Sequence, residues 1–482
     1  MAVDLNKKRV IIIGGGISGL SAAFWLKQKG FHAVVLERNA RAGGLIKSER
    51  VGGALIDHAA NCVFNFLPEV NFMVNTLGLG PEKIARQEAA KRRYLVKNGK
   101  PKVVPMKIGE LIFSDLWSLK AKLRLMVEPL IPKSAPEQEE TVAQFITRRL
   151  GREVFDRSIE PYVTGTLAGD AEKACLKSTF KQFAALEQDH GSILKGVVAR
   201  KMKGIRTACA AEVFSFKDGM ESLIKGLGNY LGDKLVTDCP IEKIERVGKE
   251  WYVHTGSAGN SIIKGDAVVM ATPAGIAAGL VDQLSVNLSM MLKGIEYSSM
   301  NIIYITFKRE DVEHKLDGIG CLIPAREKGF SSLGSLWSST LFPGRTKGDE
   351  VLFTSYLGGM RNKDLVDLPD EELIDRCLKD LRQLVGVKGF PSLTRVVRHK
   401  KALPQYNLGH QMFLKKLDEE LALIPGLHVT GNYLQGVSVR ACISQGKTVA
   451  ETIGRQFDAE HVKFKKSQRE SPVLHATERT LS

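Results

Sequence analysis

Three glycines, Gly14, Gly16 and Gly19, follow an apolar run and precede a segment with helical periodicity. At this spacing the first glycine permits a tight turn, the second lets the backbone approach a pyrophosphate, and the third lets a helix pack closely on a sheet. The amino terminus of that helix would face the phosphates. Glu37, which ends the next apolar run, is placed to accept hydrogen bonds from ribose hydroxyls. The chemistry indicated is the binding of the ADP half of a dinucleotide.

The elements that must position these residues form one strand–helix–strand unit. The segment 9–38, RVIIIGGGISGLSAAFWLKQKGFHAVVLER, is predicted to be a buried strand, a glycine turn, a helix and a second buried strand. A glycine motif alone is a weak signal, and a glycine turn that binds no nucleotide is the alternative. The flanking strand and helix, with the acid at the right distance, favour a nucleotide site in an α/β domain.

The residues after the acid favour FAD over a nicotinamide cofactor. Two arginines and then a Gly-Gly pair form a second loop, where a nicotinamide enzyme would usually enter another helix. This pattern resembles the flavin amine-oxidase superfamily, in which the loop lies beside the diphosphate. From the two loops, the predicted FAD-binding residues are Gly14, Gly15, Gly16, Ile17, Ser18, Gly19, Glu37, Arg38, Arg41, Gly43, Gly44 and Leu45.

Length and composition exclude several classes of protein. The 482 residues are enough for two or three domains. The seven cysteines include no Cys-x-x-Cys pair and no histidine cluster has ligand spacing, so neither a disulfide framework nor a metal site is expected. No apolar run approaches the roughly 20 residues that span a bilayer. Only nine residues precede the first buried strand, which leaves no room for a signal peptide, so we expect a cytoplasmic protein.

The charge balance suggests an anionic partner. The formal net charge is +16, from 69 Lys and Arg against 53 Asp and Glu, and a solvated basic surface is the alternative. Within a predicted helical span from 111 to 206, basic residues lie beside apolar ones, as in a helix on the cytoplasmic face of a membrane. A basic helix on an ordinary soluble surface would have the same pattern. The residues concerned are Lys195, Arg200, Lys201, Lys203 and Arg206, beside Ile193, Leu194, Val197 and Val198.

The order of segments predicts an α/β protein with a Rossmann-type FAD-binding domain, a mixed-sheet substrate domain and a helical insertion. Strands return at 234–247, where the superfamily places a residue near adenine. Ile241 is the candidate, with a plain core role as the alternative. The expected boundaries are 1–75, 213–275 and 421–458 for the FAD-binding domain, 76–110 and 276–420 for the substrate domain, 111–212 for the insertion and 459–482 for a flexible tail.

Motifs along most of the chain resemble the oxygen-dependent protoporphyrinogen oxidases and their coproporphyrinogen-oxidising relatives. They are PYVTGTLAGD at 161–170, LEQDHGSILKG at 186–196, FKDGMESLI at 216–224, SLWSSTLFPGR at 335–345, LGGMRN at 357–362, LPQYNLGH at 403–410 and PGLHVTGNYLQGVSVRACISQG at 425–446. Jointly they are specific, because carotenoid desaturases and amine oxidases share only the first glycine turn.

The resemblance implies a porphyrinogen bound beside the isoalloxazine ring, between the FAD-binding and substrate domains. Six electrons would leave the macrocycle in three flavin cycles, each closed by dioxygen with release of hydrogen peroxide. Because the flavin carries out the oxidation, no catalytic acid, base or nucleophile is expected in the protein. Porphyrinogen and dioxygen are the expected partners. The next enzyme of the haem pathway and a second copy of the chain are further candidates, and nucleic acid is not expected.

The resemblance also transfers individual site residues. Flavin contacts are expected from Asn61, Asn432, Val437, Ser438 and Val439. Substrate contacts are expected from Gly169, Gly320, Leu322 and Tyr356. Ordinary core packing or turn geometry is the alternative for each substrate-pocket residue.

Several positions depart from the family pattern. Ala59 and Ala60 replace a usual Gly-Pro, Ala441 replaces a usual Asp, and Arg440 stands where a small residue or Pro is common. An arginine that holds a propionate in some members has no clear match around Pro105, and Lys107 is the nearest cation.

These departures leave the exact substrate open. Protoporphyrinogen and coproporphyrinogen are both compatible with the motifs. Another desaturase or amine oxidase of the superfamily is a second hypothesis, although Gln435 stands where an amine oxidase should have Trp or an aromatic cage. A non-catalytic flavin-bound scaffold for haem-pathway enzymes is the third.

Overall fold

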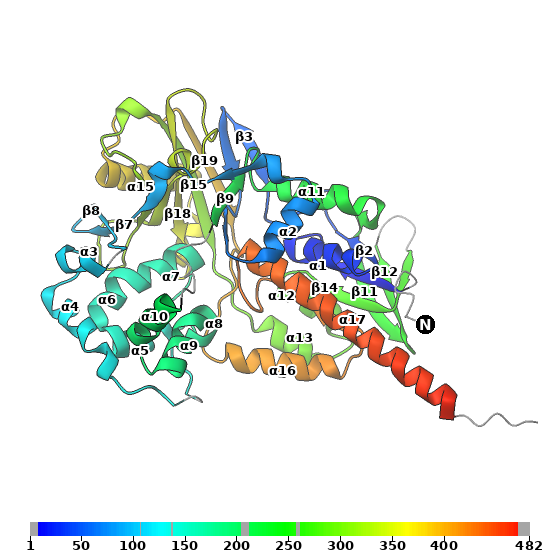
Figure 1. Cartoon of the computed structure of the whole chain (residues 1–482). Helices are drawn as coiled ribbons and strands as arrows, with labels where there is room; N and C mark the ends of the chain where they lie inside the picture. The colour runs from blue at the N-terminus through cyan, green and yellow to red at the C-terminus, as the bar shows by residue number, and fades with distance from the viewer. Residues whose placement is uncertain (1–7, 107, 136–137, 204–211, 257–260, 471–482) are drawn as a thin grey trace, which may run out of the picture.

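The computed structural model describes residues 8–106, 108–135, 138–203, 212–256 and 261–470. A parallel sheet with its helices lies at one end of the molecule and a larger mixed sheet at the other, with a group of short helices below the mixed sheet (Figure 1). The chain passes between these regions several times, so each is assembled from distant segments.

The parallel sheet has five strands in the order β10-β2-β1-β14-β20. They are β10 (Leu235–Val236), β2 (His32–Leu36), β1 (Arg9–Ile13), β14 (Ala267–Met270) and β20 (Leu427–Val429). All but the first residue of β1 are buried, as expected for a parallel strand covered on both faces. Together with α1 (Ile17–Gln28), β1 and β2 confirm the predicted strand–helix–strand unit.

Two helices cover one face of this sheet at close range. These are α1 and α17 (Val439–Glu470). Helix α11 (Glu221–Leu231) contributes side chains to the same hydrophobic core. A Cβ atom on Gly446 would lie 2.8 Å from the backbone nitrogen of Ala22, so this glycine lets α17 approach α1. The amino termini of α1 and α17 thereby belong to the same domain.

The opposite face is covered by a three-stranded sheet and three helices, which share a second core with β1 and β14. The strands are β11 (Ile241–Val247), β12 (Glu250–Thr255) and β13 (Ile262–Gly265). The helices are α12 (Ala274–Val281), α13 (Val286–Lys293) and α16 (His410–Ala422). Most of these helical residues fall within the range 276–420, which the sequence assigned to the substrate domain, and they pack against the parallel sheet. An apolar helix face does not reveal which of two sheets it will cover.

The mixed sheet has seven strands in the order β19-β15-β18-β17-β16-β7-β8. They are β19 (Leu393–His399), β15 (Met300–Lys308), β18 (Glu350–Gly358), β17 (Ser332–Trp337), β16 (Gly318–Leu322), β7 (Arg92–Lys97) and β8 (Lys100–Val103). Only β16 and β7 are paired in parallel. Helix α15 (Asp370–Val385) covers one face of this sheet.

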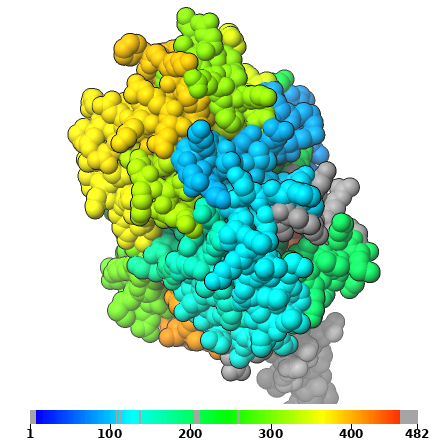
Figure 2. All heavy atoms as spheres, turned by 90° about the vertical axis from the view of Figure 1, so that its left-hand side faces the viewer, coloured from blue at the N-terminus to red at the C-terminus, as the bar shows by residue number. Residues whose placement is uncertain are grey.

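The insertion is helical in its described part, as predicted. It contains α3 (Ile108–Phe113), α4 (Leu119–Met126), α5 (Val142–Leu150), α6 (Arg152–Val154), α7 (Glu160–Leu167), α8 (Leu176–Thr179), α9 (Lys181–His190) and α10 (Ile193–Met202). In Figure 2 these helices lie below the mixed sheet, on the face turned toward the viewer. Within the described residues, no helix is both long enough and apolar enough to cross a bilayer.

Smaller elements join the two large domains. Strands β3 (Ser48–Val51) and β4 (Ala54–Asp57) form a ribbon, and β5 (Val63–Asn65), β9 (Glu212–Phe216) and β6 (Lys83–Ala85) form a three-stranded sheet. Helix α2 (Pro68–Thr76) follows β5.

Helix α17 corrects the carboxyl-terminal boundary. It continues to Glu470, past residue 458 where the folded part was expected to end. The segment 455–470 contains neither glycine nor proline, so nothing in its sequence breaks the helix. The remainder of the expected tail, 471–482, lies outside the described residues.

Candidate functional site

The glycine turn between β1 and α1 has the geometry that the sequence predicts. Gly14 has a φ of 109° and donates its N–H to Leu36 O over 2.8 Å. A Cβ atom at Gly14 would lie 2.9 Å from the oxygen of Ala271, and one at Gly19 only 2.0 Å from the oxygen of Gly14. The turn and the helix packing therefore require glycine at both positions.

Gly16 stands at the start of α1 and differs from the other two glycines. A Cβ atom here would meet no protein atom within 4 Å. Ile17 and Ser18 begin α1, and no described side chain caps it. The first N–H groups of this helix are thus left for an anionic ligand, beside a free space that a side chain would enter. This arrangement fits the diphosphate of a dinucleotide.

Glu37 is buried at the end of β2 and held by the turn itself. One carboxylate oxygen accepts the N–H of Gly15 at 2.8 Å, and the other accepts the backbone and side-chain N–H groups of Asn39 at 2.9 and 2.6 Å. These bonds fix the carboxylate beside the glycine turn. Asn39 was not recognised from the sequence.

Arg41 shapes the second loop from within. Its guanidinium donates to the backbone oxygens of Ala42 and Ile46, each at 2.8 Å, and to that of Gly44 at 2.7 Å. It also pairs with Glu221 over 3.2 Å. The arginine predicted to contact the cofactor therefore organises the loop backbone.

The second loop lies against the first. Gly43 donates its N–H to Gly15 O over 2.7 Å, and the Cα of Gly16 lies 3.5 Å from where a Cβ on Gly44 would stand. Leu45 and Arg38 are exposed at the edge of this pair of loops.

The segment before Ile241 runs beside Glu37. The N–H of Glu37 donates to Val236 O, and the N–H of Cys239 donates to Glu37 O, both at 2.9 Å. Ile241 begins β11 two residues later and packs against the core under the parallel sheet. It is therefore close to the acid that is expected to bind the ribose.

The carboxyl-terminal loop is held by a tyrosine that the sequence did not single out. The hydroxyl of Tyr406 donates to the carbonyl oxygen of Asn432 and accepts the N–H of Gly436 at 2.8 Å. His410 Nε2 donates to Tyr433 O over 3.0 Å, and its ring stacks on Tyr406. Both residues belong to the LPQYNLGH motif, which was recognised as a block without a role.

This loop leads directly into α17. Val437 and Ser438 precede the helix and Val439 is its first residue, while Ser438 Oγ accepts the N–H of Ala441 at 3.2 Å. The loop held by Tyr406 thus ends at a helix amino terminus, where the partial positive charge stabilises an electron-rich ligand. That charge suits the ring of a reduced flavin.

Leu322 and Tyr356 lie in one row across the mixed sheet. Leu322 of β16 is opposite Gly334 of β17, which is opposite Tyr356 of β18. Residues directly opposite one another point to the same face. A Cβ atom on Gly334 would lie 2.6 Å from the oxygen of Cys321 and 3.1 Å from the Cδ2 of Leu322, so the close approach of β16 requires glycine here. The Cδ2 of Leu322 also lies 2.5 Å from where a Cβ on Gly165 of α7 would stand, so the helix covers one end of the row.

Gly320 has a structural reason to be glycine. Its φ is 145°, and a Cβ atom would lie 2.1 Å from the oxygen of Ser335 on the adjacent strand. The close approach of β17 therefore excludes any larger residue, whether or not a ligand lies nearby.

Asn61 contacts the candidate substrate residue Tyr356. Its side-chain N–H donates to the Tyr356 hydroxyl at 2.6 Å. Burial raises the pKa of Tyr356, so this hydroxyl stays protonated at neutral pH. Asn61 was expected at the flavin, and its hydrogen bond to Tyr356 joins the segment before β5 to the mixed sheet.

A buried ion pair lies behind Asn61. Arg345 contacts Asp57 over 3.1 Å, and the side chains of both are 3% exposed. Arg345 also donates to Ser215 Oγ, which donates to the backbone oxygen of Asn61 at 2.9 Å. Burial raises the pKa of Asp57, and the arginine partly offsets that effect. Hydrogen bonds through Ser215 and Asn61 thus connect this ion pair to Tyr356.

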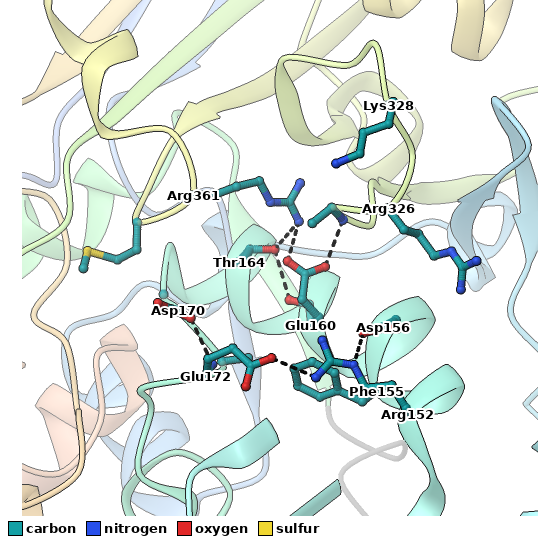
Figure 3. Close-up of a pocket in the computed structure, with 14 residues that line it drawn as sticks. Arg152, Phe155, Asp156, Glu160, Thr164, Asp170, Glu172, Arg326, Lys328 and Arg361 are labelled. Atoms are coloured by element: carbon teal, nitrogen blue, oxygen red, sulfur yellow. Dashed lines mark hydrogen bonds and ion pairs between the residues drawn. The ribbon is translucent and has the colours of Figure 1, made fainter. Parts of the chain in front are cut away.

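Gly169 lines a separate polar cavity of about 570 Å³ (Figure 3). Thr164 and Glu160 of α7 face it, and Arg361 donates to both, at 2.9 and 2.7 Å. Gly320, Leu322 and Tyr356 do not line this cavity. Leu322 and Tyr356 therefore share one sheet face, whereas Gly169 lines this cavity. Lys107, the nearest cation to Pro105, lies outside the described residues.

The chain is similar to known proteins over most of its length. A sequence profile of the family described as flavin containing amine oxidoreductase matches residues 17–454. The chain is 31% identical to protoporphyrinogen oxidase 2, chloroplastic/mitochondrial, of Arabidopsis thaliana, over 93% of this chain and 94% of that protein. It is 29% identical to coproporphyrinogen III oxidase of Bacillus subtilis (strain 168), over 92% of this chain and 97% of that protein.

A solved structure shares the fold. A protein from Exiguobacterium sp. 255-15 matches with a TM-score of 0.77 and 23% sequence identity, over 93% of this chain and 98% of that chain. This likeness confirms the predicted α/β fold class with a mixed sheet. A shared fold does not by itself determine the substrate.

Proposed function

The chain belongs to the family of flavin-containing amine oxidoreductases, and from this premise we propose that it oxidises protoporphyrinogen IX to protoporphyrin IX in haem biosynthesis. Dioxygen is the electron acceptor and hydrogen peroxide the by-product. The observation that carries the proposal is the similarity to porphyrinogen oxidases over almost the whole length of both chains.

Family membership confirms two predictions, the FAD cofactor and the oxidoreductase class. When bound, the flavin supplies the redox chemistry by accepting hydride equivalents from the substrate. The residues of this chain would then bind, orient and shield the reactants.

The two glycine loops and the carboxyl-terminal loop would hold the cofactor. The free amino terminus of α1 suits the diphosphate, and Glu37 lies where a ribose would bind. The start of α17 would lie at the ring, since Val437, Ser438 and Val439 lead into that helix.

The row Leu322–Gly334–Tyr356 would bind the macrocycle. Leu322 and Tyr356 would contact it from the same face of the sheet. The hydrogen bond from Asn61 fixes the tyrosine ring, and the ion pair of Arg345 and Asp57 supports Asn61 from behind. Rigid support of this kind orients a substrate without any proton transfer from the protein.

Coproporphyrinogen III is the second candidate substrate. The specific observation in its favour is the similarity to the Bacillus subtilis coproporphyrinogen III oxidase, nearly as high and over a similar share of the chain. The two substrates differ at the macrocycle edge, where propionates replace vinyl groups. The same catalytic arrangement would serve both.

The experiment that tests the proposal measures porphyrin fluorescence with the two porphyrinogens side by side, using the FAD-loaded protein in air. Protoporphyrinogen oxidation should give the higher kcat/KM, with hydrogen peroxide formed in step. A higher kcat/KM with coproporphyrinogen would select the second candidate. Oxidation of neither, by a protein that retains FAD, would contradict both.

We also propose that the insertion binds the surface of an anionic membrane. Several large apolar side chains on α4, α10 and the adjoining turn are exposed, and we call them the apolar face: Leu119, Leu123, Met126, Leu130, Val198 and Met202. Lys195, Arg200, Lys201 and Lys203 accompany them, while Arg206 lies outside the described residues.

The parts of the apolar face are tied together by a buried carboxylate. Glu128, in the turn after α4, accepts the Oγ–H of Ser192 and the N–H groups of Ile193 and Leu194 at the start of α10. It also pairs with the buried Arg149 over 3.2 Å. Exposed apolar groups beside cations, held rigidly, suit the boundary between headgroups and acyl chains.

A further inference from the structure

Arg440 is the second residue of α17 and directly follows the proposed flavin contact Val439. Its guanidinium donates to the backbone oxygen of Phe64 and stacks on the ring of Phe66, with Cζ 4.0 Å from the ring centroid. The side chain is half-buried. A cation is thereby held in a defined orientation where a small residue or proline was expected.

No acidic side chain within the described residues pairs with Arg440. Burial lowers the pKa of the arginine, and its electrostatic interaction with Tyr162 offsets part of this effect. A half-buried guanidinium is costly without a counter-charge, and the planar group has five N–H donors, of which one binds Phe64. The remaining donors are suited to an incoming anion.

The surroundings of Arg440 belong to the proposed substrate site. Phe64 and Phe66 follow Asn61 on the same segment, and Asn61 donates to Tyr356. Tyr162 lies on α7, the helix whose Gly165 contacts Leu322. Arg440 is therefore close to two segments that contact this row: the segment after Asn61, which reaches Tyr356, and α7, which reaches Leu322.

Aromatic surface is available beside the charge. Phe64, Phe66 and Tyr162 are 40%, 49% and 44% exposed, which is high for large aromatic side chains. Aromatic faces bind flat, electron-rich rings well, and a fixed guanidinium binds a carboxylate through two parallel hydrogen bonds. The combination matches a macrocycle that carries acidic side chains.

We propose that Arg440 binds a carboxylate of the porphyrinogen and so determines which edge of the macrocycle enters the site. Phe66 holds the guanidinium in place, and Phe64 and Tyr162 contact the ring system. This inference rests on the proposed function, since it assigns the group that recognises the acidic side chains of that substrate.

The test compares Arg440→Met with Arg455→Met, because Arg455 is an exposed arginine on the same helix. Each FAD-loaded variant is assayed with protoporphyrinogen IX and with its dimethyl ester, which lacks the two carboxylates. Arg440→Met should raise KM for the free acid about tenfold, the loss of roughly one charge-assisted interaction, and leave kcat within about twofold. KM for the ester should not change, and Arg455→Met should match the wild type with both.

Binding of the oxidised product provides a readout without turnover. Quenching of porphyrin fluorescence should show that Arg440→Met binds protoporphyrin IX more weakly and its dimethyl ester as well as the wild type does. Arg440→Lys, which keeps the charge, should retain part of the preference for the acid, and Arg440→Gln should lose it. This pair decides the matter if Arg440→Met does not fold.

Two results would overturn the assignment. An equal loss with acid and ester would mean that Arg440 only supports β5, and unchanged binding of both would mean that the carboxylates lie elsewhere. Failure of the wild type to oxidise any porphyrinogen would instead refute the proposed function, so the two claims fail separately.

Discussion

At the scale of single residues, a substitution at Gly16 is expected to affect cofactor binding without affecting folding. A Cβ atom at this position meets no protein atom, whereas one at Gly19 would lie 2.0 Å from a backbone oxygen. Gly16→Val should therefore fold and lose FAD, because the side chain fills the space left for the diphosphate. Gly19→Val is the contrasting variant and should fail to fold. The measurement is the ratio of flavin to protein absorbance after purification, with the unfolding midpoint. A stable, fully yellow Gly16→Val protein would refute this placement of the diphosphate.

Tyr406 should position the flavin loop through its hydroxyl alone. Tyr406→Phe removes one donor and one acceptor and leaves Asn432 O and Gly436 N–H without their partner. Two such bonds contribute roughly 1 kcal/mol each, so the Kd for FAD should rise at least about tenfold, with a changed flavin absorption spectrum. Tyr94→Phe, which removes a hydroxyl bound to Asp317 on the distant mixed sheet, is the control. If both variants bind FAD equally well, Tyr406 does not hold the loop.

Local motifs could be predicted from the sequence, whereas contacts between distant segments could not. The glycine turn and Glu37 were predictable because their spacing lies within one local unit. Tyr406 and Arg440 act on partners far away in the sequence, and no spacing rule connects them. Arg440 was noticed only as a departure from a pattern, and its aromatic neighbours became visible in the folded chain.

At the scale of elements, strand register decides which candidates meet. Leu322 and Tyr356 share a face because β16, β17 and β18 pair with Gly334 between them. The sequence predicted both residues but not this register. It could not reveal that the close approach of β17 requires glycine at position 320. The strand–helix–strand unit was predictable because it is local, whereas the apolar faces of α12, α13 and α16 did not reveal that these helices cover the parallel sheet.

Leu322→Asp tests this row. A carboxylate there would be partly buried beside a polycarboxylate substrate, so desolvation and like-charge repulsion should lower turnover at least about tenfold, a barrier increase of about 1.4 kcal/mol. FAD content should stay near that of the wild type. Val103→Asp, on the edge strand β8 of the same sheet, introduces the same charge at an exposed position and should leave turnover unchanged. Equal turnover in the two variants would place the substrate away from this sheet face.

At the scale of the whole molecule, the proposed membrane contact rests on the exposed apolar face of the insertion and on the cations of α10. The protein should bind vesicles containing anionic lipid in a salt-sensitive manner, since surface attraction is screened within about 10 Å at 0.1 M salt. Leu123→Asp should weaken binding at all salt concentrations by removing apolar contact. Phe390→Asp, at a 91% exposed aromatic residue outside the insertion, is the matched control. Equal binding to neutral and anionic vesicles would remove the electrostatic part of the proposal, and an unaffected Leu123→Asp would remove the apolar part.

The central claim is that porphyrinogen transfers electrons directly to the bound flavin. Mixing the FAD-loaded protein with protoporphyrinogen IX without oxygen tests this most directly, with flavin absorbance recorded in a single turnover and porphyrin fluorescence recorded after oxygen is admitted. The account predicts that the flavin loses its visible band at a rate that saturates with porphyrinogen, and regains it with formation of hydrogen peroxide when oxygen is admitted. Flavin that stays oxidised with protoporphyrinogen and coproporphyrinogen, yet is reduced by dithionite, would contradict it.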